Sequence, residues 1–142
     1  IMKILTTVIT ALSIIQIGCV SPKSNYINRD FKETYLYSFK MTYFKQLLFI
    51  GFNRTNEIQT LLVQDRSGYG EPILTQQDIS LIDSLVRIDN VKMSQDSILS
   101  IGTRSEGIQG KRVFDYSITK FNSKWLDSLA KAQYKYYKKI NK

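Results

Sequence analysis

Apolar side chains recur at helical spacing over the longest regular stretch of the chain, residues 30–52. The positions that repeat at steps of three and four residues are Leu36, Phe39, Tyr43, Leu47 and Ile50. This spacing places them on one face of an α-helix. Gly51 stands near the end of the stretch, where a glycine commonly ends a helix. We therefore expect one long amphipathic helix that stops at this glycine.

Two further helices are predicted in the middle of the chain. The first starts at Thr55 and stops near Asp65, with Ile58, Leu61 and Leu62 directed inward. The second begins after Thr75, because a threonine followed three residues later by the acid Asp78 is typical of a helix N-terminus. Its inward positions are Ile79, Leu81, Ile82, Leu85 and Val86, and we expect it to end at about residue 89.

The C-terminal third predicts two more helices, over residues 111–121 and 123–139. The apolar positions of the last helix are Trp125, Leu126 and Leu129, with Tyr136 as a further candidate for burial. Residues 96–102 fit either a short helix or a strand. Evidence for strands is thin elsewhere, so the prediction is an all-α, single-domain bundle of four to six helices over residues 30–142.

Two glycine-rich loops interrupt these helices, at residues 65–72 and 102–110, because their glycines and Pro72 cannot continue a helix. The residues that they offer to a protein partner are Asp65, Arg66, Tyr69, Glu71, Arg104 and Glu106. A large aromatic ring surrounded by charges is a common contact pattern in protein interfaces. The alternative stays open: Tyr69 could fold back over the core, with the charges only keeping the loops soluble.

The N-terminal segment predicts export and lipid anchoring. A lysine directly after Met2 precedes the uncharged stretch 4–17, and Gly18 and Cys19 follow. About 14 apolar residues are too few for a membrane-spanning helix, and this order is typical of a bacterial lipoprotein signal peptide with Cys19 as the lipidation site. We expect residues 1–18 to be removed, residues 19–29 to form a polar tether, and the protein to face the periplasm from the bacterial envelope.

Charge is distributed unevenly along the chain. The net charge is +8, yet residues 55–106 hold eight acids against four basic residues, and no acid follows Asp127. Lysines and tyrosines alternate near the C-terminus, a composition that can bind nucleic acid. Export makes nucleic acid an unsuitable partner, which leaves anionic lipid, peptidoglycan, or a merely solvated helix end.

The composition removes most catalytic chemistry. The chain has no histidine, and its single cysteine is Cys19. Nearly all nucleophilic triads and zinc sites need one of these residues, so we expect no metal and no cofactor. Glu71 and Glu106 could act as a glycosidase acid and base only if the fold brought them close together. We expect a binding protein and not an enzyme.

One block near the C-terminus resembles a known family. In residues 113–131 a helix ends in an aromatic-x-Ser turn at Phe121-Asn122-Ser123, followed by Leu126-Asp127-Ser128-Leu129 and basic residues. This order is similar to the C-terminal signature of the type VI secretion amidase immunity family. The resemblance implies a periplasmic, mostly helical, often dimeric protein that blocks the cleft of a peptidoglycan amidase toxin. Family members commonly carry cysteines in these helices, whereas this chain has Tyr116 and Ser117.

Two functions follow as hypotheses. The first is a lipid-anchored immunity or inhibitor protein that binds an amidase toxin through its loops, as a monomer or a homodimer. The second is an envelope structural or assembly lipoprotein that holds peptidoglycan or a membrane complex through its basic C-terminal helix.

Overall fold

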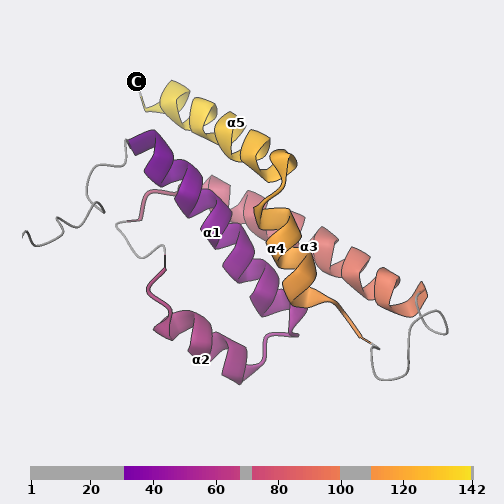
Figure 1. Ribbon diagram of the computed structural model, residues 1–142. Helices are drawn as coiled ribbons and strands as arrows, with labels where there is room; N and C mark the ends of the chain where they lie inside the picture. Colours follow the sequence, from indigo (N-terminus) through magenta and orange to yellow (C-terminus); the bar gives the residue numbers. More distant parts are fainter. Residues whose placement is uncertain (1–30, 68–71, 100–109, 142) are drawn as a thin grey trace, which may run out of the picture.

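The computed structural model describes residues 31–67, 72–99 and 110–141, and this part of the chain is all-α (Figure 1). Its five helices confirm the predicted fold class. Their bounds are α1 (Phe31–Gly51), α2 (Asn56–Gln64), α3 (Gln76–Leu99), α4 (Val113–Phe121) and α5 (Lys124–Ile140). The first glycine loop lies between α2 and α3, and the second between α3 and α4.

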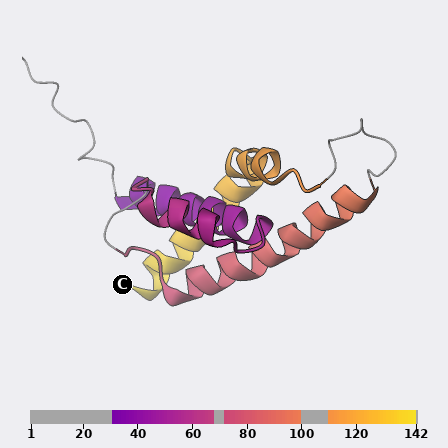
Figure 2. The same ribbon diagram turned by 90° about the horizontal axis from the view of Figure 1, so that it is seen from below.

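Helix α1 is the centre of the bundle, and each of the other four helices packs against it (Figures 1 and 2). Helix α3 runs in the same general direction as α1, because Tyr35 meets Asp78 near the start of both helices and Tyr43 meets Asp89 further along. Helix α5 runs the opposite way. Its first turn places Trp125 against Tyr43, and Tyr134, near its end, lies against Tyr35.

The core forms along the predicted inner face of α1. Phe39, Tyr43 and Leu47 are fully buried, and their neighbours across the interface include Ile82 on α3 and Leu126 on α5. Full burial of one such apolar side chain contributes about 1.5–3 kcal/mol to stability. The periodicity of the sequence therefore identified the face that holds the bundle together.

Three inward predictions were wrong. Trp125 is 45% exposed, Tyr136 is 45% exposed, and Leu61 on α2 is 61% exposed. Trp125 lies at the edge of the core because the first turn of α5 covers the bundle with Leu126 instead. Helix α2 lies on the surface of α1 and buries none of its residues.

Helix α1 ends at Gly51, as predicted, but the left-handed residues that follow the helix lie beyond the glycine. They are Asn53, with φ of 57°, and Arg54, with φ of 59°. The amide of Asn53 donates to the Ile50 carbonyl at 2.9 Å, and the amide of Arg54 donates to the Phe49 carbonyl at 2.8 Å. These two bonds are the Schellman pattern of a helix C-terminus.

Gly51 has a packing role instead. A β-carbon at this position would lie 2.6 Å from Cγ1 of Val113, which is closer than real side chains approach. The missing side chain lets the start of α4 pack directly against the end of α1. This contact brings α4 onto the bundle immediately after the second loop.

Helix α3 continues ten residues beyond the predicted end at residue 89, so the ambiguous positions Ile98 and Leu99 are helical. Its N-terminus is the predicted capping box. The Thr75 hydroxyl accepts from the Asp78 amide at 3.1 Å, and the Asp78 carboxylate accepts from the Thr75 amide at 2.9 Å. Asp78 is buried, so this cap also fixes where α3 meets α1.

A second threonine N-cap, Thr55 of α2, gives a matched test of this geometry. Thr75→Ala should lower the free energy of unfolding by about 1 kcal/mol, because the capping oxygen is lost. Thr55 is the N-cap of α2 but makes no side-chain cap bond, so Thr55→Ala should change it by less than about 0.5 kcal/mol. Urea titrations of both variants measure the difference, and equal losses would contradict the capping box.

Candidate functional site

Asp89 on α3 is a carboxylate buried at the junction of three helices, with 2% of its surface exposed. Its Oδ2 accepts a hydrogen bond from the Tyr43 hydroxyl of α1 at 2.5 Å and lies 3.0 Å from Nζ of Lys120 on α4. Its Oδ1 accepts from the Tyr116 hydroxyl of α4 at 2.9 Å, and Nζ of Lys92 lies 3.7 Å away. We call Asp89, Tyr43, Tyr116 and Lys120 the Asp89 cluster.

A second buried carboxylate repeats the arrangement at the other end of the α1–α3 interface. Asp78, 3% exposed, accepts from the Tyr35 hydroxyl at 2.9 Å while it caps α3. Buried carboxylates are costly unless they are paired and hydrogen-bonded. Both are satisfied by side chains from neighbouring helices, so each carboxylate ties α3 to the bundle.

Burial and the adjacent carboxylates together raise the pKa of these tyrosines. For Tyr43 and Tyr35, removal from water is the larger cause, and the hydrogen bond to the aspartate adds to it. The pKa of Tyr116 is raised in the same way. The tyrosines therefore stay protonated and donate hydrogen bonds to the carboxylates. The role of the cluster is structural, because these bonds hold the helices together.

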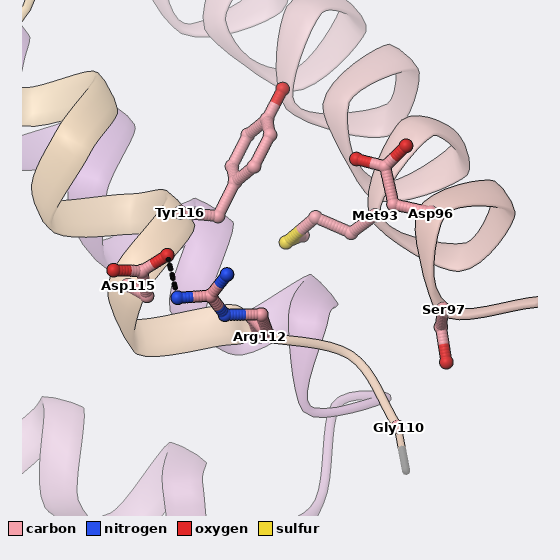
Figure 3. Close-up of a pocket in the computed structure, with 7 residues that line it drawn as sticks. All are labelled: Met93, Asp96, Ser97, Gly110, Arg112, Asp115 and Tyr116. Atoms are coloured by element: carbon pink, nitrogen blue, oxygen red, sulfur yellow. Dashed lines mark ion pairs between the residues drawn. The ribbon is translucent and has the colours of Figure 1, made fainter. Parts of the chain in front are cut away.

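A small pocket lies beside this cluster, between the last turns of α3 and the first turn of α4 (Figure 3). Met93 and Asp96 line it from α3, and Tyr116 lines it from α4. Nη2 of Arg112 and Oδ2 of Asp115 form an ion pair at 2.9 Å on its rim. The cavity holds about 130 Å³, well below the roughly 300–1,000 Å³ of small-molecule sites. It can accept a single side chain of a partner.

The first loop begins with a fixed turn. Asp65 accepts from the Ser67 amide at 3.0 Å and from the Ser67 hydroxyl at 2.7 Å, and it pairs with Nζ of Lys45 at 2.9 Å. The hydrogen bonds from Ser67, followed by the Lys45 contact, lower the pKa of Asp65 to about 2. Asp65 was predicted to contact a partner, and here it holds the end of α2 against α1. Arg66, the next predicted contact residue, is exposed.

Apolar exposure next to this loop is the feature that sequence reasoning missed. Leu61 is 61% exposed and Val63 is 73% exposed, while Ile58 and Leu62 are partly covered. At 100° per residue these four side chains span an arc of about 200° around α2. Helix α1 covers only one side of such an arc. We call Leu61, Val63, Asp65 and Arg66 the α2 surface.

The two loops are separated along the molecule. The first precedes α3 and the second follows it, so their described flanks lie at opposite ends of a 24-residue helix (Figure 2). Such a helix is about 36 Å long. The other predicted site residues, Tyr69, Glu71, Arg104 and Glu106, lie outside the described residues, as does the predicted lipidation site Cys19.

The described ranges contain neither a candidate metal site nor a candidate membrane-spanning helix. No three histidine, cysteine or acidic side chains there are grouped so that they could hold a metal ion. None of the five described helices combines the length and the apolar character needed to cross a bilayer.

Comparison with known proteins adds no relative: no protein-family model, curated protein or solved structure matches this chain. Residues 113–131, which resemble the immunity family, stabilise the bundle. Ser123 caps α5 by accepting from the Leu126 amide at 3.1 Å, and Asp127 pairs with Lys40 of α1 at 2.5 Å.

The raised tyrosine pKa values predict loss of stability in alkali. Above pH about 10 the tyrosines ionise in the unfolded chain but not in the folded one, so the unfolded state binds fewer protons and folding weakens as pH rises. Each of Tyr35 and Tyr43 should lower the free energy of unfolding by about 1.4 kcal/mol per pH unit in this range. Urea titrations between pH about 8 and 11 measure the slope.

Tyr43→Phe supplies the control for this slope, since phenylalanine keeps the ring and cannot ionise. Its loss of stability per pH unit should be smaller than that of the parent by the contribution of one tyrosine. Identical slopes would show that Tyr43 ionises equally easily in both states.

Proposed function

We propose that this chain is a non-enzymatic, lipid-anchored inhibitor of the bacterial envelope that binds a peptidoglycan amidase toxin through the α2 surface. The observation that carries the proposal is the exposure of Leu61 and Val63 on a helix that buries none of its residues. Scattered exposed apolar residues are ordinary, but neighbouring apolar side chains exposed on one helix beside a charged loop have the composition of a protein interface.

The position of the α2 surface supports a role in contact. Helix α2 packs on α1 and ends at the turn held by Asp65 and Lys45, so its exposed face is presented on an ordered support. An interface that is fixed before binding avoids the entropic cost of ordering it. Apolar anchors at the centre and the charges of Asp65 and Arg66 at the rim would then provide affinity and orientation.

Charge and sequence support the class of partner. Residues 55–106 carry eight acids against four basic residues. Asp78 and Asp89 are buried, and the remaining six acids suit a basic cell-wall hydrolase because complementary charge accelerates encounter. The amidase as partner rests on the resemblance of residues 113–131 and on the predicted export. The Asp89 cluster is consistent with a binding role, because its carboxylate is used to join helices.

A test begins with capture of the partner. The tagged chain is expressed in its own bacterium, purified from the envelope with its bound protein, and that protein is assayed for hydrolysis of peptidoglycan amide bonds. We expect the captured protein to be an amidase and to be inhibited when the purified chain is added back. Capture of a protein without cell-wall hydrolase activity would contradict the proposal.

Substitutions on α2 then locate the contact. Leu61→Gln with Val63→Gln should weaken inhibition of the captured amidase at least tenfold, because interface anchors contribute about 1–3 kcal/mol each. The matched control is Ile88→Gln with Val91→Gln, a pair on α3 that is 53% and 55% exposed. Circular dichroism should show that both variants are folded. Equal inhibition by the two variants would mean that the α2 surface is not the contact.

A further inference from the structure

A basic groove lies where the last turns of α5 meet the first turn of α1. Its walls are formed by Lys32 of α1 and by three lysines of α5, and its lining residues are Lys32, Lys131, Tyr134, Lys135 and Lys138. The groove is open and encloses about 460 Å³. We call these five residues the basic groove.

Among the described residues, no carboxylate supplies a counter-charge to the lysines of the groove. All four are exposed, and within the described part of the chain none forms an ion pair with a carboxylate. Lys131, Lys135 and Lys138 follow one another at steps of four and three residues, which places them on one face of α5. Like charges held together repel each other, so this face is stabilised when an anion lies against it.

The floor of the groove is anchored in the bundle. The Tyr134 ring centroid lies 5.4 Å from that of the buried Tyr35 and 6.4 Å from that of Phe31, and Nζ of Lys138 lies 5.9 Å from the Tyr134 ring. These contacts fix the end of α5 against α1. The lysines therefore project from an ordered surface and not from a loose tail.

The groove also lies at the end of the molecule where the predicted anchor joins the domain. Helix α1 starts at Phe31, beside the C-terminal turns of α5 (Figure 1). Cys19 precedes Phe31 by twelve residues, and twelve residues span at most about 40 Å. An anchored chain would hold the groove within this distance of the bilayer.

We propose that the basic groove binds the phosphate headgroups of anionic phospholipids and so holds the bundle against the membrane surface. This contact lies on a different surface from the α2 surface and does not depend on the proposed inhibitor function. It would leave α2, which lies on the other side of α1 from α5 in Figure 1, free for a partner.

Vesicle binding tests the proposal without the lipid anchor. The chain from residue 19 onward, carrying Cys19→Ser, is mixed with vesicles of phosphatidylcholine alone or with added phosphatidylglycerol, and the bound fraction is measured by sedimentation. We expect binding only to the vesicles that contain phosphatidylglycerol, with affinity that falls as salt is raised. Equal affinity for both vesicles, or binding to neither, would overturn the proposal.

Point substitutions are preferable to removing residues 131–142, because such a truncation would also uncover Tyr35. Lys131→Gln, Lys135→Gln and Lys138→Gln together should weaken binding on the order of 100-fold, since each lysine near an anionic surface contributes roughly fivefold. The control removes three exposed cations elsewhere, by Arg54→Gln, Arg87→Gln and Lys124→Gln.

The control should lose much less affinity than the groove variant. Equal losses would show that net charge alone governs binding, and this would overturn the assignment to the groove. Purified peptidoglycan is tested separately as the alternative ligand of the groove. A groove variant that no longer binds peptidoglycan but binds phosphatidylglycerol vesicles as well as the parent would also overturn the proposal.

Discussion

The buried carboxylate of Asp89 is the interaction on which the arrangement of the bundle depends. It accepts hydrogen bonds from Tyr43 of α1 and Tyr116 of α4 and pairs with Lys120 of α4, so a single side chain of α3 joins three helices. Apolar packing alone would allow neighbouring helices to slide along one another, whereas a buried charge is stable only where its partners meet it. Asp78 and Tyr35 provide a second point of contact on the same interface.

Asp89 and Asp78 act inside the bundle. Two surfaces outside it, the α2 surface and the basic groove, differ in chemistry. The α2 surface presents apolar side chains beside the turn held by Asp65. The basic groove gathers lysines where α5 meets the start of α1, and no carboxylate of the described residues pairs with them. The proposed anchored inhibitor would use the basic groove against the membrane and the α2 surface against its partner. The two proposals are independent, because the residues of each surface belong to different helices.

The sequence predicted the helices well because their apolar stripes and the Thr75 capping box are local signals. Helix α2 was found, but the exposure of Leu61 depends on how little of α2 the neighbouring α1 covers, which no local pattern records. The Asp89 cluster did leave a signal: the buried face of α3 repeats at steps of three and four residues, at Asp78, Ile82, Val86, Asp89 and Met93. Two acids on an apolar stripe indicate buried, partnered carboxylates, although their tyrosine partners come from distant parts of the sequence.

The most direct test of the central role of Asp89 is a double-mutant cycle with Tyr43→Phe and Asp89→Asn, followed by urea unfolding. A hydrogen bond to a charged group contributes about 1.5–3 kcal/mol, and one to a neutral group contributes about half as much. Tyr43→Phe should therefore cost clearly more in the chain with the carboxylate than in the chain with the amide. The same cost in both backgrounds would mean that the charge of Asp89 does not hold α1 and α3 together.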